Sequence, residues 1–354
     1  MALSVHTPVC LAGDLGGCEP RLWYNVWMSR SRSATTWTDV GWVLGIALSG
    51  AAVVRAVRPE RSTVDIAITA ATPWLLLPSG ALLAGALLAR RRHLTSLATA
   101  LVAYQAKCNR PWARPPVSAE KVVEGPQLRV AFANVWRSNT DVEGILAELA
   151  AAEHDVVALA EVTDHHLDAI EAVLPPSTYP WRKVEPDGPD GSKGLALVSR
   201  FPLERVEKWW SQGHPQLDGT VRVPGALPFR LLVVHTWGPV GYQIRSWRAQ
   251  LVDIAARAEG QRTVIVGDFN ATLQHRSFAR LVGSRWSNAG TRAFGGWGAT
   301  WPANRWWRPA ALRIDHILAG PEISVRSGRA WRARGSDHRP VSAVLRLPPA
   351  PETP

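Results

Sequence analysis

Acid, amide and imidazole side chains recur at the ends of short apolar runs in the C-terminal two thirds of the chain. Asn134 follows the run LRVAFA, Glu161 follows DVVALA, and His235 follows FRLLVV. Asp268 and Asn270 belong to the tetrapeptide Gly-Asp-Phe-Asn, which follows RTVIV. Apolar runs of this length are typical of buried strands, so a packed sheet would present these side chains together at one edge.

Two Asp-His pairs near the C-terminus add further candidates. Asp315 and His316 are adjacent, and Asp337 and His338 follow Ser336 and are separated by Arg339-Pro340 from the apolar run VSAVLRL. An aspartate that accepts a hydrogen bond from Nδ1–H of a histidine fixes the tautomer and raises the imidazole pKa for proton transfer. We expect the pair before VSAVLRL to act in catalysis, and His316 to have a structural role.

The chemistry of this residue set indicates a hard metal ion. Carboxylate and amide oxygens without thiolates suit Mg²⁺ or Mn²⁺, and a divalent ion helps an anionic phosphate ester to accept a nucleophile. Cys10, Cys18 and Cys108 have neither a zinc-site spacing nor the even number of a disulfide framework. No serine or cysteine nucleophile elbow accompanies the acids. The set therefore predicts a metal-dependent phosphoesterase.

The order Asn, Glu, His, Gly-Asp-Phe-Asn, Ile-Asp-His, Ser-Asp-His resembles the endonuclease/exonuclease/phosphatase superfamily over Leu128 to Leu347. This superfamily includes DNase I-like nucleases, abasic-site endonucleases, neutral sphingomyelinases and inositol polyphosphate 5-phosphatases. The resemblance implies an α/β fold, the four-layer sandwich of two mixed sheets between helices.

The resemblance also implies a metal site. Glu161 matches the principal metal ligand, and Asn134 and Asp337 match residues beside it. Trp136 stands where some nucleases place an aspartate, so this resemblance predicts no second metal ligand at that position.

The catalytic roles follow from the same resemblance. Asp268 and Asn270 match residues that position the nucleophilic water and the phosphate. His338 matches the catalytic imidazole, and Asp315 matches the residue that orients it. His235 matches a histidine that contacts the phosphate or acts as an acid.

Three apolar stretches precede this domain: Val40 to Val54, Ile66 to Ala89 and Leu94 to Ala106. A membrane-spanning helix needs about 20 apolar residues. The second stretch is long enough, and the first is long enough if Arg55 snorkels. The third is either a short span or a helix that lies in the membrane interface. We expect an N-terminal tail over residues 1–36 and about three transmembrane helices over residues 37–107.

The orientation of these helices does not follow from charge, because the flanking basic residues divide equally between the two sides. Residues 1–27 lack a signal-peptide pattern, and Met28 opens a Ser/Arg run typical of a cytoplasmic start, so we expect translation to begin there. The hydrophobic N-terminus, Pro73-Trp74, NVWRSNTD and Thr300-Trp301-Pro302 resemble actinobacterial membrane-anchored proteins related to the glycopeptide (vancomycin/teicoplanin) resistance membrane protein. That resemblance implies a multi-pass protein of the cell membrane with an extracytoplasmic catalytic domain.

A proline-containing linker over residues 108–126 separates the membrane region from a catalytic domain over residues 127–347. The apolar runs predict strands at 128–134, 155–160, 194–199, 229–235, 263–267, 313–318 and 341–346. Amphipathic patterns predict helices at 141–152, 164–174 and 242–258. We expect the proline-rich residues 348–354 to form a disordered tail.

The substrate remains open at this stage. The formal net charge is +11, but neither part of the chain has the dense basic face that by itself indicates nucleic-acid binding. Tryptophans between the motifs could line a lipid groove or lie at the bilayer interface: Trp209, Trp210, Trp297, Trp301, Trp306 and Trp307. We expect membrane lipids as partners and a phosphorylated substrate near the membrane, such as a phospholipid or polyprenyl (pyro)phosphate. A nuclease of the same fold and a non-catalytic membrane-binding protein are the alternatives.

Overall fold

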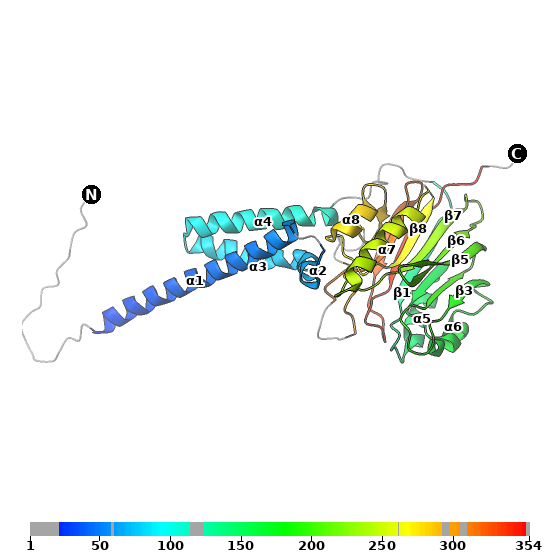
Figure 1. The fold of residues 1–354 in the computed structure, drawn as a ribbon, viewed down its shortest axis with the longest axis horizontal. Helices are drawn as coiled ribbons and strands as arrows, with labels where there is room; N and C mark the ends of the chain where they lie inside the picture. The colour runs from blue at the N-terminus through cyan, green and yellow to red at the C-terminus, as the bar shows by residue number, and fades with distance from the viewer. Residues whose placement is uncertain are drawn as a thin grey trace, which may run out of the picture.

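The computed structural model describes residues 21–57, 60–113, 124–260, 262–291, 298–304 and 310–351. The chain forms a helical arm, which consists of α1 to α4, and an α/β domain attached to one end of that arm (Figure 1). The arm contains α1 (Arg21–Val57), α2 (Thr63–Ala70), α3 (Thr72–Leu88) and α4 (Arg92–Ala113).

The stretch predicted to form one span over residues 66–89 is broken into two helices. The axes of α2 and α3 differ in direction by 65°. Pro73, at the start of α3, supplies no backbone N–H and disfavours the helical conformation of the residue before it. The predicted apolar stretch therefore forms two helices at an angle, with a proline at the start of the second.

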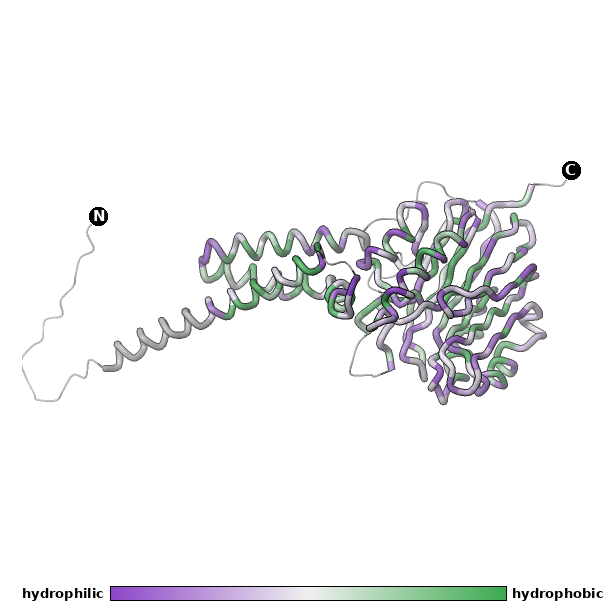
Figure 2. Tube along the Cα trace, viewed as in Figure 1, coloured by the Kyte–Doolittle hydropathy of each residue, from purple (hydrophilic) through white to green (hydrophobic). Residues whose placement is uncertain are grey.

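One described helix, Trp37–Val57 of α1, is by itself long and apolar enough to cross a membrane. The bent pair α2 and α3 would be a second candidate if it counts as one span, whereas α4 does not meet the criterion. Hydrophobic residues run along α1 and α3 (Figure 2), and Val43 and Ile46 of α1 are 69% and 67% exposed. Such an apolar outer face is consistent with a membrane anchor.

Small residues bring α1 close to its neighbour in the arm. A Cβ atom at Gly41 would lie 2.7 Å from Cδ2 of Leu94, and one at Gly45 would lie 2.9 Å from Cδ2 of Leu97. Glycines four residues apart lie on one helix face and allow close packing of helices that have no water to exclude. The helices of the arm thus form a packed bundle.

The α/β domain contains two six-stranded sheets. The first has the order β11-β12-β1-β2-β4-β3 and consists of β1 (Gln127–Asn134), β2 (Val156–Ala160), β3 (Trp181–Glu185), β4 (Leu195–Ser199), β11 (Ser324–Ala330) and β12 (Val341–Arg346). The second has the order β5-β6-β7-β8-β10-β9 and consists of β5 (Leu203–Ser211), β6 (His214–Val221), β7 (Phe229–His235), β8 (Thr263–Asp268), β9 (Ser287–Asn288) and β10 (Asp315–Ala319).

Helices cover the outer faces of both sheets, which completes four layers. The helices α5 (Val142–Ala151) and α6 (Leu167–Val173) pack on the first sheet, and α7 (Gln243–Arg257) and α8 (Arg276–Val282) pack on the second. Alternation within β7 shows the arrangement: Leu231 and Val233 enter the core between the sheets, while Leu232 and Val234 contact the layer of α7. The predicted four-layer α/β sandwich is confirmed.

The C-terminal residues are ordered further than the sequence suggested. The amide of Leu227 donates to the carbonyl of Pro348 over 2.9 Å, and the amide of Ala350 donates to Gly225 over 2.9 Å. Residues 348–350 therefore pair with the loop that precedes β7, which corrects the expectation that disorder begins at residue 348. The paired backbone supplies the order that a proline-rich composition alone does not predict.

Backbone and side-chain contacts join the arm to the α/β domain. Arg276, the first residue of α8, donates to the carbonyls of Arg55 and Ala56 at the end of α1 over 3.3 and 3.0 Å. The indole Nε1 of Trp74, near the start of α3, donates to the carbonyl of Ala311 over 2.9 Å. The end of α1 and the beginning of α3 thus lie on the same side of the arm, against the α/β domain.

Candidate active site

Six strands place polar groups at one edge of the sandwich. The parallel neighbours β1 and β2 end at Asn134 and just before Glu161, and the parallel neighbours β7 and β8 end at His235 and Asp268. Asp315 begins the antiparallel strand β10 in register with Asp268, and β12 begins shortly after Asp337 and His338. The structure thus brings the predicted site residues of both sheets to one edge.

Asn134 connects the acids of the two sheets. Its Nδ2 donates to Oε1 of Glu161 over 2.9 Å and to Oδ2 of Asp268 over 3.2 Å. The backbone amide of Arg137 donates to the other oxygen of Glu161 over 3.1 Å. Glu161 has φ 59°, a left-handed conformation that side chains other than glycine rarely adopt. The surrounding contacts therefore hold Glu161 in a strained backbone position, as is frequent at functional sites.

His338 and Asp315 form a buried pair. Both oxygens of Asp315 lie 3.0 and 3.1 Å from Nδ1 of His338. Nε2 of His338 then faces Oδ2 of Asp268 at 3.7 Å and Oδ1 of Asp337 at 3.9 Å. Burial opposes protonation of His338, but Asp315 and Asp268 outweigh it and raise the imidazole pKa to about 10. The ring is held as a cation with Nε2–H directed at the other acids.

Asp268 is almost fully buried. Burial, followed by the nearby charge of Asp315, raises the pKa of Asp268 to about 8. Its Oδ1 accepts from the backbone amide of Asn270 over 2.8 Å, and Nδ2 of Asn270 donates to the carbonyl of Thr236. Asn270 is thereby fixed beside Asp268.

His235 approaches the acids from β7. Its Nε2 lies 3.9 Å from Oε1 of Glu161 and 3.9 Å from Oδ2 of Asp268. Burial lowers the pKa of His235, although the charge of Glu161 acts in the opposite direction. The side chain of Gln216 holds the backbone of His235. Nε2 of Gln216 donates to the carbonyl of His235, and Oε1 of Gln216 accepts from the amide of His235.

The donor set fits a divalent cation. Oδ1 of Asp337 is buried and has no hydrogen-bond donor among the described residues. Burial raises the pKa of Asp337, and Glu161 and Asp315 add to the rise because their negative charges lie nearby. Ligand atoms of Asp268, Asp315 and His338 also lie within 4.8 Å of one another, but Asp315 is already bound to Nδ1 of His338. The buried oxygen of Asp337 is a carboxylate ligand that a hard cation would satisfy.

His316 faces away from these groups. Its Nδ1 lies 2.9 Å from Nδ2 of Asn288, and its Nε2 lies 2.8 Å from the carbonyl of Ala271. Its ring packs against Phe269 and Phe278, and burial lowers its pKa to about 3. Both ring nitrogens of His316 therefore have partners away from the acids of the site, in line with the expected structural role.

The structure adds a residue that the sequence analysis did not assign to the site. Nε1 of Trp301 donates to Oδ2 of Asp337 over 3.1 Å. The motif Thr300-Trp301-Pro302 drew attention as a family feature, but the sequence carries no signal that the indole reaches Asp337. Trp297, Trp306 and Trp307 lie outside the described residues.

Comparison with known proteins places these observations in a family. The model of the endonuclease/exonuclease/phosphatase family matches residues 131–338 of the chain. No curated protein matches it in sequence.

Solved structures share the fold at low sequence identity. An endonuclease/exonuclease/phosphatase from Beutenbergia cavernae DSM 12333 is 20% identical with a TM-score of 0.50, over 64% of this chain and 73% of that chain. TDP2 from D. rerio, complexed with single strand DNA product, is 17% identical with a TM-score of 0.50, over 62% and 99%. A family protein from Leptotrichia buccalis C-1013-b is 14% identical with a TM-score of 0.51, over 62% and 100%.

Proposed function

Because the chain belongs to the endonuclease/exonuclease/phosphatase family, whose members hydrolyse phosphoric ester bonds, we propose that it is a membrane-anchored phosphoesterase dependent on Mg²⁺ or Mn²⁺. Its substrate is a phosphate ester or pyrophosphate held at the membrane surface, with a lipid-linked phosphate as the leading class. The apolar arm is also the basis for placing the chain with the membrane-anchored subgroup related to the glycopeptide resistance membrane protein.

A series of hydrogen bonds between the arm and the site supports the proposal of a membrane substrate. Trp74 of the arm donates to the carbonyl of Ala311, and the amide of Ala311 donates to the carbonyl of Trp301 over 3.0 Å. Trp301 in turn donates from its indole to Asp337. The beginning of α3 is therefore separated from a site carboxylate by only two residues, so the site lies next to the arm. A substrate whose phosphate projects from a membrane would meet the site there.

The chain's residues divide between metal binding and proton transfer. Glu161, Asp337 and Asn134 would hold the cation, which supplies positive charge to the phosphate oxygens. Asp268, with Asn270 beside it, orients water and in its ionised form accepts a proton from it as the water oxygen attacks phosphorus. The bond from phosphorus to the leaving oxygen breaks, and that oxygen takes its proton from His338. His338, kept protonated by Asp315, donates from Nε2 toward the phosphate.

We place the catalytic domain outside the cytoplasmic membrane. The support is the Ser/Arg-rich segment that precedes Trp37 in the first half of α1, which is typical of a cytoplasmic start, and the attachment of the α/β domain to the opposite end of α1 through Arg276.

A product-release panel on the full chain in neutral detergent micelles tests the proposed substrate class. Phosphatidic acid, a polyprenyl pyrophosphate, nucleotides and DNA are compared with Mg²⁺, with Mn²⁺ and with a chelator. We expect metal-dependent phosphate release from the lipid-linked substrates. Cleavage of DNA alone would replace the proposal with a nuclease, and no turnover of any substrate would indicate a binding protein.

Glu161→Gln tests the metal site. The amide keeps the shape of the side chain and loses its charge, so we expect most activity to disappear at limiting Mg²⁺ and to return in part with excess Mn²⁺. Circular dichroism should show an unchanged fold. Glu143→Gln, an exposed acid on α5, is the matched control. Wild-type turnover by Glu161→Gln at limiting Mg²⁺ would show that the cation binds elsewhere.

A further inference from the structure

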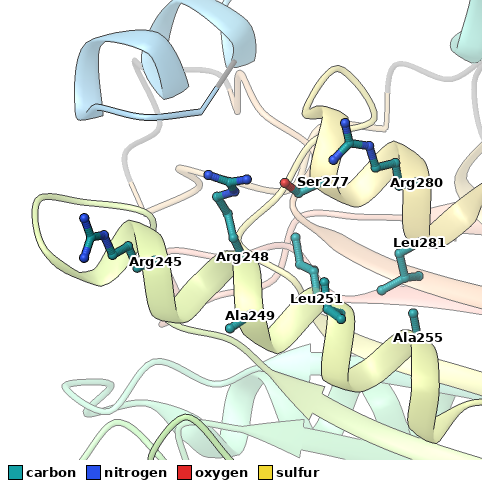
Figure 3. A pocket seen from close by; sticks show the side chains of 9 residues that line it. Arg245, Arg248, Ala249, Leu251, Ala255, Ser277, Arg280 and Leu281 are labelled. Atoms are coloured by element: carbon teal, nitrogen blue, oxygen red, sulfur yellow. The ribbon is translucent and has the colours of Figure 1, made fainter. Parts of the chain in front are cut away.

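A second cavity region lies outside the active site, between α7 and α8. A cavity of about 430 Å³ is lined by Arg245 and Arg248 of α7 and by Arg280 of α8 (Figure 3). An adjoining cavity of about 630 Å³ shares Arg245 and Arg248 and extends to Glu60 and Arg61, beside the end of α1; the carboxylate of Glu60 accepts from Ser277. Volumes of this size are typical of sites for small ligands.

The three arginines of the cavity, Arg245, Arg248 and Arg280, have no counter-ion. Over the residues that the structure describes, no carboxylate oxygen lies within ion-pair distance of their guanidinium groups. Arg257 on the same helix shows the contrast, because it pairs with Asp218 over 2.6 Å and also with Glu207. Three exposed cations without a counter-ion along one cavity (Figure 3) favour a bound anion, and guanidinium groups suit phosphate in particular.

Apolar groups form the rest of the cavity wall. Leu251 and Leu281 fill the space between the two helices, and Arg248 and Arg280 extend beyond them (Figure 3). Val252, which also lines the cavity, is 68% exposed. A free phosphate ion would use only the arginines, whereas a phospholipid would use the arginines for its phosphate and the apolar wall for its glycerol and acyl groups.

The cavity lies at the level where α1 ends. Arg276 caps the final carbonyls of α1, and the next residue, Ser277, donates from its amide to Glu60 just beyond that helix over 3.1 Å. On the other helix, the amide of Gly241 before α7 donates to Thr63 of α2 over 3.0 Å. Both helices that form the cavity are therefore attached to the same end of the arm. If α1 crosses the membrane, this end lies at the lipid headgroups.

We propose that Arg245, Arg248 and Arg280 form a binding site for the phosphate group of an anionic phospholipid, separate from the active site. This inference rests on the proposed membrane anchor. The site would hold α7 and α8 against the lipid surface and so fix the height of the active site above it.

Native mass spectrometry of the full chain in neutral detergent tests this site. A chelator is present throughout, so that lipid binding is measured without turnover. Dioleoyl phosphatidylglycerol is titrated against the wild type and against the triple variant Arg245→Gln/Arg248→Gln/Arg280→Gln. Dioleoyl phosphatidylcholine and inorganic phosphate are the comparison probes. The control variant Arg205→Gln/Arg326→Gln/Arg329→Gln removes the same charge from β5 and β11, the outermost strands of the two sheets.

We expect the triple variant to weaken phosphatidylglycerol binding on the order of 100-fold, because each arginine near an anionic lipid contributes about a factor of five. The control variant should bind like the wild type, and phosphatidylcholine should bind weakly to all three proteins. Equal binding by the triple and control variants would overturn the proposal. Displacement of the lipid by millimolar phosphate would instead identify a site for soluble phosphate.

The lipid-binding result is independent of the proposed function. If the product-release panel fails while phosphatidylglycerol binding depends on the three arginines, the lipid site stands without the proposed activity. If the panel succeeds while the triple variant binds lipid normally, the phosphoesterase stands without this lipid site. Thermal unfolding of each variant confirms that the exposed substitutions leave the fold intact.

Discussion

His338 is the residue on which the proposed proton transfer depends. Asp315 holds Nδ1 and leaves Nε2 directed at the acids, so removal of the ring removes a positioned proton donor. We expect His338→Ala to lower kcat by about 10²–10⁴-fold with a smaller effect on metal affinity. Asp315→Asn should have the same effect in milder form, because the ring remains but loses its fixed orientation. Steady-state kinetics across metal concentrations separates the two parameters.

His316→Ala is the matched control for this experiment, since His316 is adjacent to Asp315 but bonds Asn288 and Ala271 instead of the site. The variant should be less stable and keep its turnover per folded molecule. A near-normal His338→Ala together with a folded, inactive His316→Ala would exchange the two assignments.

His316 also predicts how stability depends on pH. Its pKa is about 3 in the folded chain, against an ordinary value of 6.5, because burial excludes the charged ring. Below pH 6.5 the unfolded chain binds a proton here and the folded chain does not, so stability falls as pH decreases toward 3. Above pH 6.5 both states are neutral and the contribution is fully present. The expected loss is about 1.4 kcal/mol per pH unit for this one group.

Urea unfolding in detergent micelles between pH 7.5 and pH 4.5 measures this slope. His316→Asn should be less stable at pH 7.5 but should lose stability less steeply with acid, by about one proton. His165→Asn, which replaces an exposed ring, should leave the slope unchanged. An unchanged slope in His316→Asn would show that other groups dominate the acid response.

At the scale of elements, apolar runs predict the strands whose buried side chains are apolar. They miss strands whose buried side chains are polar and are satisfied by distant partners. All seven predicted strands are present: six carry consecutive buried side chains, as in β7 and β8, and β12 alternates buried with half-buried ones. The strand β6 escaped prediction because it buries His214, Gln216 and Asp218. Gln216 bonds the backbone of His235, and Asp218 pairs with Arg230 and Arg257. These partners are far away in sequence, so no local pattern shows that the polar residues can be buried.

The active site was likewise predictable only in part. Side chains that directly follow apolar strands could be placed at one edge, because strand ends fix their position. Trp301 could not be placed, because its segment folds back on Leu312 and only that pairing brings the indole to Asp337. A loop residue positioned by another loop leaves no periodic signal in sequence.

Trp301 therefore supplies a prediction about the loop that supports the metal site. Trp301→Phe keeps the apolar ring and removes the donor to Asp337. We expect the metal concentration for half-maximal activity to rise about 10–100-fold, the usual effect of losing a group that orients a metal ligand. Metal titrations of activity measure it. Trp331→Phe is the control, because Trp331 donates to Glu148 on α5, away from the site. Equal metal requirements in the two variants would contradict the role given to Trp301.

At the scale of the whole molecule, the helices of the arm pack together, so the direction of each helix relative to the α/β domain is fixed. If the three apolar stretches were separate spans, the stretch Leu94 to Ala106 would decide the side on which the catalytic domain lies, because it is either a short span or an interfacial helix. In the structure, α1 ends against the α/β domain, α3 leads away from it, and α4 returns beside α8 (Figure 1). The pair α3 and α4 begins and ends on the same side of the arm, so under the proposed membrane anchor this pair does not change the side on which the domain lies. The orientation of α1 alone then determines the location of the domain.

The topology prediction follows from that geometry. With the Ser/Arg-rich segment before Trp37 inside the cell, the end of α1 and the α/β domain attached to it lie outside. Alkaline phosphatase fused after Leu347 should be active, since it matures only after export, and green fluorescent protein fused there should be dark. A reporter fused after Leu88, at the far end of α3, should show the reverse pattern. A fluorescent fusion after Leu347 would mean that α1 is inverted, and would move the substrate from envelope lipids to nucleic acids or soluble phosphates inside the cell.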